Sequence, residues 1–535
     1  MRVDFKETIM SASPSQADFQ NLLYSSSELD LYLDLNNTGI KPEVLTAHTE
    51  MFDRAFRSMQ ELEAGGIANP DEDRQVGHYW LRAPELSPNS EIREQIERTQ
   101  ASILQFSRDI LKGHIQTPHG ENFSDLLLIG IGGSALGPQF IADALAEEHG
   151  LRPHFMDNTD SDGIDLVLNG LGGRLARTLV LVISKSGGTA ETRNGMLEAQ
   201  EAFTRAKLDF SAQAVAITGE GSQLYDTASS ENWLAIFPMW DWVGGRTSVM
   251  SAVGLLPAGL MGIDIQAFLT GARKMDELTR YHGLMQNPAA LLAVSWYILG
   301  AGNGKKDMVI LPYRDRLLLF SRYLQQLIME SLGKALDLDG QRVDQGIAVY
   351  GNKGSTDQHA YVQQLRDGLD NFFVTFIEVL RERSGDSILV DGKNTSGEYL
   401  QGFFMGTETA LSQNDRNSLV ITVGDLTPES IGALIALYER TVGFYADFIH
   451  INAYHQPGVE AGKKAAGAVL DLKNQILELL AKSDTSLSIN EIAEVLEMKG
   501  QKRQIYLILR HLAANQPLRV EGSFHEPETV RVGIH

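Results

Sequence analysis

The stretch Leu181-Val-Ile-Ser-Lys-Ser-Gly-Gly-Thr-Ala-Glu-Thr192 decides how this chain is interpreted. An apolar run leads into a short loop of hydroxyls and glycines, and a helix-forming segment begins at Ala190. This order predicts a strand, a tight loop and the N-terminus of a helix. Free backbone N–H groups then point at one spot, where Ser184, Ser186 and Thr189 add further donors. The loop is therefore a candidate phosphate site, although an ordinary polar loop has the same composition.

The alternation of strand and helix extends on both sides of this stretch. From Asp125 onward, apolar runs alternate with helix-forming segments, which is typical of a parallel sheet with helices on both faces. We predict two α/β subdomains, at residues 116–300 and 301–470. The strands of the first are predicted at Leu126–Ile129, His154–Met156, Leu179–Ile183, Ala214–Thr218 and Leu234–Phe237, and those of the second at Met308–Leu311, Ile347–Tyr350, Phe372–Val379 and Leu419–Val423.

Both ends of the chain have a different pattern. Residues 1–115 carry helical spacing at Met51–Ala64 and Ser90–Lys112, which predicts a helical N-terminal segment. Residues 485–535 suggest two helices followed by a β-wing, the outline of a small winged-helix-like module. Positive and negative side chains balance there, which favours a packing or assembly role over DNA recognition.

Composition excludes several classes of function. The chain has 535 residues and no cysteine, so disulfides, thiolate metal sites and cysteine nucleophiles are ruled out. Its 46 Lys and Arg against 69 Asp and Glu give a net charge of −23, which argues against binding nucleic acid over the general surface. A cleft on an acidic protein can still be positive and hold a small anion. Neither a signal-peptide core nor a membrane-spanning apolar run is apparent, so we expect a cytoplasmic protein with no membrane partner.

A glycine-rich loop follows the first predicted strand. Gly130-Ile-Gly-Gly-Ser-Ala-Leu-Gly137 fits the dinucleotide fingerprint G-x-G-x-x-A, and Asp157 ends the next strand. Ser134 inside this loop, together with the second loop at Ser184–Thr189, favours a smaller ligand. Two such loops at one sheet edge form a cup for a monophosphate. A nicotinamide cofactor is the alternative on these features.

Two motifs between residues 240 and 333 supply groups suited to proton transfer. Trp240-Asp-Trp-Val-Gly-Gly-Arg-Thr-Ser248 places Arg246 behind paired glycines, where the backbone can approach a ligand. The segment Ser321–Gly333 predicts a helix with Gln326 and Glu330 four residues apart on one face. Taken alone, Arg246 is more often a surface residue in a salt bridge, and Glu330 a partly exposed or ion-paired one.

Two later motifs carry further candidates. Gly351-Asn-Lys-Gly-Ser-Thr-Asp-Gln-His-Ala360 is a polar loop that holds His359. Tyr454-His-Gln-Pro-Gly-Val-Glu-Ala-Gly-Lys463 opens a long helix, with Gln456 at the turn and Lys463 inside it. Loop position singles out the histidine, and surface solvation is the usual fate of a lysine.

Taken together, these motifs resemble the glucose-6-phosphate isomerase family, and within it the cyanobacterial and plastid branch. The similarity is carried by GIGGSALGP, SKSGGTAET, WDWVGGR, QQLIMESLGK, GSTDQHA and QPGVEAGK, in the family's order, across about residues 30–470. It implies two sugar-isomerase-type (SIS) α/β subdomains around one cleft, in a homodimer. The implied activity interconverts D-glucose 6-phosphate and D-fructose 6-phosphate, with no metal or organic cofactor.

The resemblance also implies roles for single residues. Glu330 matches the base that moves a proton between C2 and C1 through a cis-enediolate, and His359 matches the ring-opening group, supplied by the neighbouring subunit. Lys463 matches a residue near the ring oxygen, and Arg246 the cation that faces the reacting carbons. The substrate-binding positions are Gly133, Ser134, Ser184, Lys185, Ser186, Thr189, Gln326 and Gln456. Thr247 and His455 depart from the family pattern without removing any of these groups.

Two other functions compete with this interpretation. One is an isomerase of a different phosphosugar, which the sequence separates poorly from the first. The other is a regulator that senses sugar phosphates without catalysis, as in proteins that join such folds to helix-turn-helix modules. The combined presence of Glu330, His359 and Lys463 favours an enzyme, because a binding protein has no use for that set.

Overall fold

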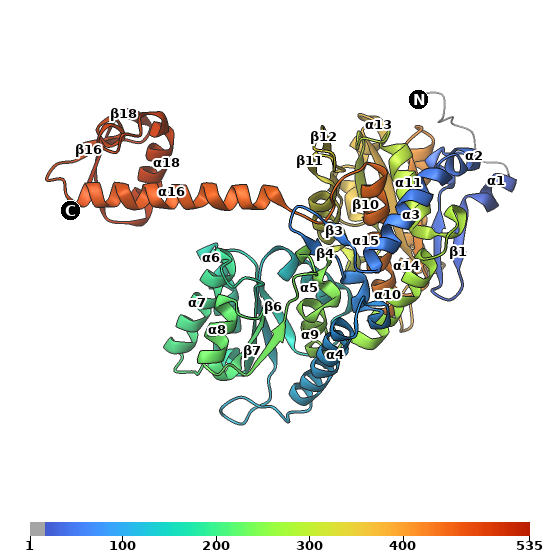
Figure 1. Cartoon of the computed structure of the whole chain (residues 1–535), viewed down its shortest axis with the longest axis horizontal. Coiled ribbons are helices and arrows are strands. Elements are labelled where there is room, and N and C mark those ends of the chain that lie inside the picture. The colour runs from blue at the N-terminus through green and yellow to red at the C-terminus, as the bar shows by residue number, and fades with distance from the viewer. Residues whose placement is uncertain (1–15, 535) are drawn as a thin grey trace. The chain divides into compact units, whose positions relative to one another are not determined.

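The chain folds into two compact units that divide between His455 and Gln456. Their structure is a computed structural model that describes residues 16–534. The larger unit contains two sheets covered by helices, and the smaller contains a long helix and a three-stranded sheet (Figure 1). The site described below is built from the larger unit.

The first sheet has five parallel strands in the order β6-β5-β7-β8-β9. Their bounds are β5 Asp125–Ile129, β6 Arg152–Met156, β7 Thr178–Ile183, β8 Ala214–Thr218 and β9 Ala235–Pro238, each within two residues of the prediction at either end. Strand β7 is buried at every position because both faces of the sheet are covered. Leu179, Leu181 and Ile183 belong to one core, whereas Val180 and Val182 belong to the core on the other face.

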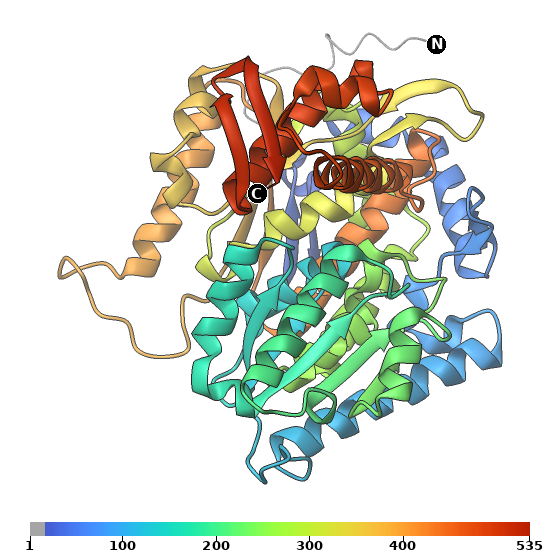
Figure 2. The same cartoon turned by 90° about the vertical axis from the view of Figure 1, so that its left-hand side faces the viewer.

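Helices form a layer on each side of this sheet. One layer contains α6 Ser161–Leu171, α7 Ala190–Arg205 and α8 Gln223–Ser230, which lie in front of the sheet in Figure 2. The other contains α4 Ser90–Leu111, α5 Leu136–Leu145 and α9 Ala252–Leu260 (Figure 1). The strand-helix alternation of the sequence therefore produces the predicted sandwich.

The second sheet has six strands in the order β1-β2-β15-β14-β10-β13. The parallel strands are β10 Asp307–Pro312, β13 Val349–Tyr350, β14 Phe372–Val379 and β15 Ser418–Val423. The N-terminal hairpin β1 Leu23–Ser26 and β2 Leu31–Asp34 extends it antiparallel, with Leu33 opposite Ile421. The N-terminal segment, which was predicted to be helical, therefore also contributes two strands to the second sheet. Strands this short are stabilised by pairing with β15 rather than by local propensity.

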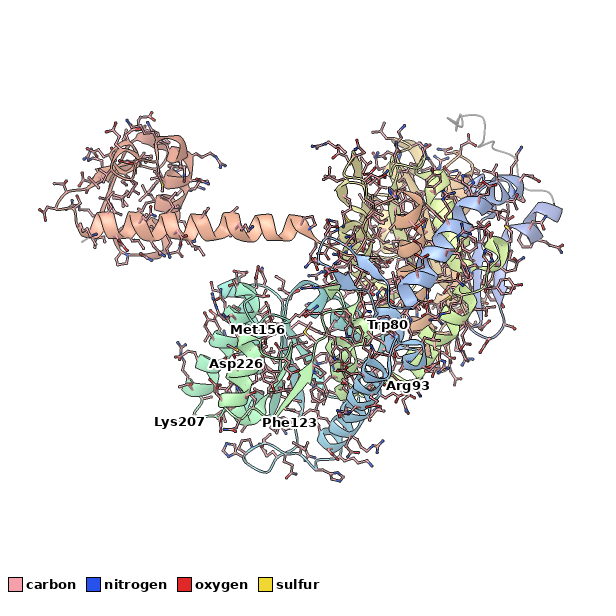
Figure 3. All side chains as sticks on the ribbon, in the orientation of Figure 1. Trp80, Arg93, Phe123, Met156, Lys207 and Asp226 are labelled. Carbon is pink, nitrogen blue, oxygen red and sulfur yellow. The ribbon has the colours of Figure 1, made fainter. Side chains whose placement is uncertain are left out.

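The remaining elements complete the larger unit. Its other helices are α1 Gln16–Asn21, α2 Pro42–Thr46, α3 Thr49–Glu63, α10 Ile265–Thr279, α11 Pro288–Leu299, α12 Phe320–Leu324, α13 Val362–Asp367, α14 Ser396–Ser412 and α15 Pro428–Phe448. Two small ribbons pair β3 Ile67–Asn69 with β4 Arg74–Gln75, and β11 Lys334–Leu336 with β12 Arg342–Gln345. Side chains fill the interior (Figure 3), where Trp80 is fully buried, whereas Lys207 is exposed.

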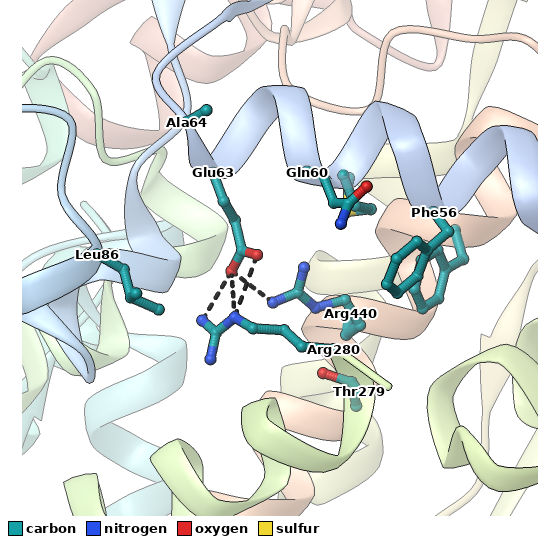
Figure 4. Close-up of a pocket in the computed structure, with 10 residues that line it drawn as sticks. Phe56, Gln60, Glu63, Ala64, Leu86, Thr279, Arg280 and Arg440 are labelled. Carbon is teal, nitrogen blue, oxygen red and sulfur yellow. Dashed lines mark hydrogen bonds and ion pairs between the residues drawn. The ribbon is translucent and has the colours of Figure 1, made fainter. Parts of the chain in front are cut away.

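A buried ion network fastens α3 and α10 to α15. Glu63 accepts hydrogen bonds from Arg280 (2.8 Å) and Arg440 (2.7 Å), as Figure 4 shows. Burial opposes ionisation of Glu63, yet Arg440 and Arg280 hold the pKa of its carboxyl below the usual value. Arg82 pairs in turn with Asp276 and Glu439. Removing one member would leave an uncompensated buried charge, so the network ties these helices together specifically.

The smaller unit contains α16 Pro457–Ala481, α17 Ile489–Val495, α18 Lys502–Asn515 and an antiparallel sheet ordered β16-β18-β17, with bounds Leu487–Ser488, Glu526–Ile534 and Leu518–Ser523. Two helices followed by a β-wing match the predicted winged-helix-like outline. The predicted boundaries at 470 and 485 are corrected, because Leu472, Ile476 and Leu480 of α16 pack in the core of this unit.

Candidate active site

The two polar loops meet at one edge of the first sheet. Strands β5 and β7 are direct neighbours, with Leu126 opposite Leu179, so the loops at their carboxyl ends lie side by side. In the second loop, the N–H of Gly187 donates to Ser184 Oγ (3.2 Å), and Ser184 Oγ donates to Thr189 Oγ1 (3.4 Å). The hydroxyls thus stabilise the turn that precedes α7. This arrangement suits a phosphate at the helix N-terminus.

The glycine loop is packed against the segment that carries Arg246. A Cβ on Gly133 would lie 2.1 Å from the carbonyl oxygen of Gly245, so only glycine fits there. A Cβ on Gly132 would lie 3.3 Å from Nε2 of Gln326. The glycines therefore bring backbone from two loops together beside Gln326.

Lys185 joins the hydroxyl loop to the same segment. Its ammonium donates to the carbonyl oxygens of Asp241 (3.1 Å) and Val243 (3.2 Å). Burial lowers the pKa of Lys185, although Asp241 opposes this shift. The lysine predicted to lie beside the phosphate thus also holds the Trp240–Ser248 loop in place.

Arg246 and Glu330 form an ion pair, with Nε 3.1 Å from Oε2. The arginine side chain is 5% exposed and the glutamate 19%, so the pair is largely shielded while the carboxylate stays accessible. Arg246 also donates to the carbonyl oxygens of Ala453 (2.5 Å) and His455 (3.2 Å). Burial lowers its pKa and Glu330 opposes the shift, but a guanidinium stays charged at any physiological pH.

The helix predicted over Ser321–Gly333 is not regular. It begins as α12 and becomes a π-helix over Gln325–Glu330. Wide turns of this kind occur frequently at functional sites. Here the irregular turn carries Gln326 and Glu330, both of which face a common cavity.

That cavity has a volume of about 510 Å³ and joins the glycine loop to the π-helix. Its lining includes Gly132, Gln326 and Glu330. Asp157, the possible ribose ligand of a dinucleotide site, also lines it, but this carboxylate accepts hydrogen bonds from Gln139 (2.9 Å) and Arg322 (3.2 Å). The geometry therefore supports a compact sugar-sized ligand over a nicotinamide cofactor.

Comparison with known proteins decides the family. The sequence model of the family described as phosphoglucose isomerase matches residues 39–412 and 407–488. The chain belongs to this family. A glucose-6-phosphate isomerase from Thermosynechococcus vestitus is 60% identical, with 93% of this chain and 94% of the relative covered. One from Synechococcus elongatus is 59% identical, with 97% and 98% covered.

A solved structure of the phosphoglucose isomerase family agrees with the fold. The crystal structure of a glucose-6-phosphate isomerase from Chlamydia trachomatis superimposes with a TM-score of 0.79 at 25% identity, with 93% of this chain and 96% of that chain covered. The α/β architecture with two largely parallel sheets is therefore the architecture of the family.

Three residues that match the family motifs lie on other elements than the one that carries Glu330. His359 ends the 3-10 helix η12 Thr356–His359, where its side chain is exposed. Gln456 and Lys463 belong to the smaller unit, and the side chain of Lys463 lies outside the described residues. The roles of these three residues stay predictions.

Two groups beside the site were missed in the sequence. Lys334 is 5% exposed and its Nζ donates to the carbonyl oxygen of Glu330 at 2.6 Å. Asp71 lies 3.9 Å from Nδ1 of His455 and accepts a hydrogen bond from Asn452 (2.6 Å). Lys334 is the last residue of the motif QQLIMESLGK, whereas no sequence pattern singles out Asp71.

Residues 16–534, which the structure describes, contain neither a metal-binding cluster nor a membrane-spanning helix. No cluster of three or more histidine, aspartate or glutamate side chains suited to a metal ion occurs in that part of the chain. Nor does the described chain contain a helix long and apolar enough to cross a membrane.

Proposed function

We propose that the protein is a glucose-6-phosphate isomerase, which interconverts D-glucose 6-phosphate and D-fructose 6-phosphate in glycolysis and gluconeogenesis. The observation that carries the proposal is the Arg246–Glu330 pair, because it borders the cavity that the glycine loop also lines. The names of the relatives from Thermosynechococcus vestitus and Synechococcus elongatus support the same substrate.

The chemistry follows from one carboxylate beside one fixed cation. Aldose–ketose isomerisation moves a proton between adjacent carbons through an enediolate. Glu330 takes the proton from C2 and returns it to C1, since a single carboxylate can reach both carbons. Arg246 stabilises the negative charge that develops on the enediolate oxygens. Proton transfer of this kind needs neither a metal nor an organic cofactor.

The phosphate loops hold the end of the sugar that does not react. Ser134 lies on the glycine loop, and Ser184, Ser186 and Thr189 lie on the loop that opens α7. Binding energy from the phosphate is used to place C1 and C2 beside Glu330. The family resemblance assigns ring opening to His359 and proximity to the ring oxygen to Lys463, and it matches Gln326 and Gln456 to substrate-contacting glutamines.

The loops give a prediction that separates binding from chemistry. The double variant Ser184→Ala/Thr189→Ala removes two hydroxyl donors and leaves Glu330 in place. We expect KM for fructose 6-phosphate to rise by about 10²-fold or more, since two hydrogen bonds to a charged group are lost and each contributes about 1.5–3 kcal/mol, while kcat changes far less. Steady-state kinetics measure both constants. An unchanged KM would place the phosphate elsewhere, and the exposed hydroxyl variant Thr204→Ala serves as the control.

We propose that the active form is a homodimer in which His359 completes the site of the neighbouring subunit. Gln358 beside it donates to the carbonyl oxygen of Phe403 (3.0 Å), so η12 lies against α14. Large apolar side chains are exposed on α14 and the segment before it, including Ile388 at 76%, Leu389 at 56%, Phe403 at 46% and Met405 at 55%. Exposed apolar residues of this extent are typical of an interface between proteins.

Hybrid dimers test this arrangement. Glu330→Gln and His359→Gln subunits are each expected to be inactive as homodimers. If His359 acts across the interface, a mixed dimer has one intact site, so random mixing of equal amounts restores about a quarter of wild-type activity. The two variants are unfolded together, refolded, and assayed against each variant refolded alone.

The contrary result is equally definite. A histidine that acts within its own subunit leaves every mixed site defective, and no activity returns on mixing. Wild-type protein carried through the same procedure measures the refolding yield. Light scattering of each sample establishes whether dimers form.

Proton NMR of the protein with glucose 6-phosphate in D₂O tests the function itself. We expect fructose 6-phosphate to appear with deuterium at the reacting carbons, because the base exchanges its proton with solvent. Binding without conversion would favour the sugar-phosphate sensor. Conversion of mannose 6-phosphate at a higher rate would favour the other phosphosugar isomerase.

We further propose a cytoplasmic location and no nucleic-acid or membrane partner. The net charge of −23 supports the absence of a nucleic-acid partner, because a polyanion is repelled by an acidic surface. The cytoplasmic location follows from the proposed reaction, because its sugar-phosphate substrates are cytoplasmic metabolites.

A further inference from the structure

Lys334 is buried and lies four residues after Glu330, with its side chain in contact with the main chain of that residue. It begins strand β11 and pairs with Gln345 of β12, so a ribbon fixes its backbone. Its side chain turns back toward the preceding helix, where Nζ donates to the carbonyl oxygen of Glu330 at 2.6 Å. A lysine that is 5% exposed is uncommon, because burying its charge is costly.

The hydrogen bond from Lys334 gives a partner to a carbonyl group near the C-terminal end of the helix. The last carbonyl groups of a helix have no partner within it, and a positive charge there interacts favourably with the helix dipole. Glu330 is the final residue of the π-helix Gln325–Glu330. The ammonium of Lys334 thus binds the main chain of the very residue that carries the reacting carboxylate.

Several charged groups surround this ammonium. Arg246 repels it, whereas Glu330 and Asp71 attract it, and His455 lies close enough to respond to its charge. Burial, reinforced by Arg246, lowers the pKa of Lys334 to about 8. Burial also lowers the pKa of His455 below its ordinary value. Loss of the proton from Lys334 thus falls in the mildly alkaline range.

We propose that Lys334 is a positioning residue for the isomerisation, and that its ammonium fixes the main chain of Glu330 and thereby the carboxylate. The inference rests on the proposed function. Lys334 acts through Glu330 and does not contact the sugar. A charged donor forms a hydrogen bond about twice as strong as a neutral one, so the base is held best while Lys334 is protonated.

Three variants separate this role from simple packing. Lys334→Met keeps the length and apolar stem but removes the charge, whereas Lys334→Arg keeps a permanent charge. Lys306→Met is the matched control, because the Lys306 side chain is largely shielded and pairs with Asp370 (2.7 Å) just before strands β10 and β14. The kcat and KM for fructose 6-phosphate and the melting temperature of each are compared.

We expect Lys334→Met to lower kcat about 10–100-fold, since a small displacement of a catalytic group costs up to about 10²-fold. KM should stay within about threefold, because the phosphate loops are untouched. Lys306→Met should keep the wild-type kcat. A wild-type kcat in folded Lys334→Met, or an equal loss in Lys306→Met, would overturn the inference.

The pH profile provides a readout that packing does not affect. Wild-type kcat is expected to fall as pH rises through about 8, as Lys334 loses its proton. Lys334→Arg should retain most of the activity at neutral pH and lose this alkaline decline, because a guanidinium stays protonated. If Lys334→Met does not fold, the comparison of the wild-type and Lys334→Arg pH profiles tests the inference without it. An alkaline decline that persists in Lys334→Arg overturns the inference, whereas a wild-type protein without activity refutes the proposed function itself.

Discussion

Glu330→Gln is expected to abolish isomerisation while the phosphosugar still binds. Glutamine has the same shape, and its amide oxygen can accept the hydrogen bond that Nε of Arg246 donates at 3.1 Å. It cannot take a proton from C2, however, so kcat should fall by about 10²–10⁴-fold, the usual contribution of a general base. A coupled assay measures kcat. Calorimetry with a hexitol 6-phosphate, which lacks the carbonyl and cannot react, measures binding.

The control is Glu201→Gln on α7, where the side chain is 53% exposed and pairs with Arg205 on the same helix. It should behave as wild type, since exposed pairs contribute little. Normal turnover by Glu330→Gln would refute the assignment of the base. Loss of hexitol phosphate binding would instead assign Glu330 to binding, and the proton transfer would need another group.

The central strands of both sheets were predictable because they are largely buried on two faces. In β7, one face contributes Leu181 and the other Val182 to different cores, so the sequence shows a continuous apolar run. The hairpin β1–β2 was missed, because its antiparallel pairing with β15 joins residues nearly 400 positions apart. Local propensity carries no information about such a contact.

The part of the site formed by the two polar loops was predictable, because the strand order of a parallel sheet determines which loops lie together. Carboxyl ends of neighbouring parallel strands meet at one edge, so the loops after β5 and β7 were bound to lie together. The contact between Arg246 and Glu330 joins residues 84 positions apart, and only the family resemblance brought them together in advance. The importance of Lys334 depends on its burial, which arises from tertiary packing and leaves no local pattern.

Arg246→Lys is expected to lower kcat by about 10²–10³-fold, the cost of removing one donor that stabilises a developing oxyanion. The guanidinium serves Glu330 and the carbonyl oxygens of Ala453 and His455 from separate nitrogens. An ammonium is a point charge on a flexible stem and cannot hold all three at once. Steady-state kinetics measure the loss, and Arg273→Lys, 48% exposed on α10, is the matched control.

A hydroxamate analogue of the enediolate distinguishes the cause of that loss. If Arg246 stabilises charge that develops in the transition state, affinity for the analogue should fall by about the same factor as kcat/KM, because such analogues share the interactions of the transition state. Affinity for the hexitol 6-phosphate should change little, since that ligand has no developing charge. Equal losses for both ligands would show that Arg246 mainly shapes the site, and the charge on the enediolate oxygens would then require a different cation.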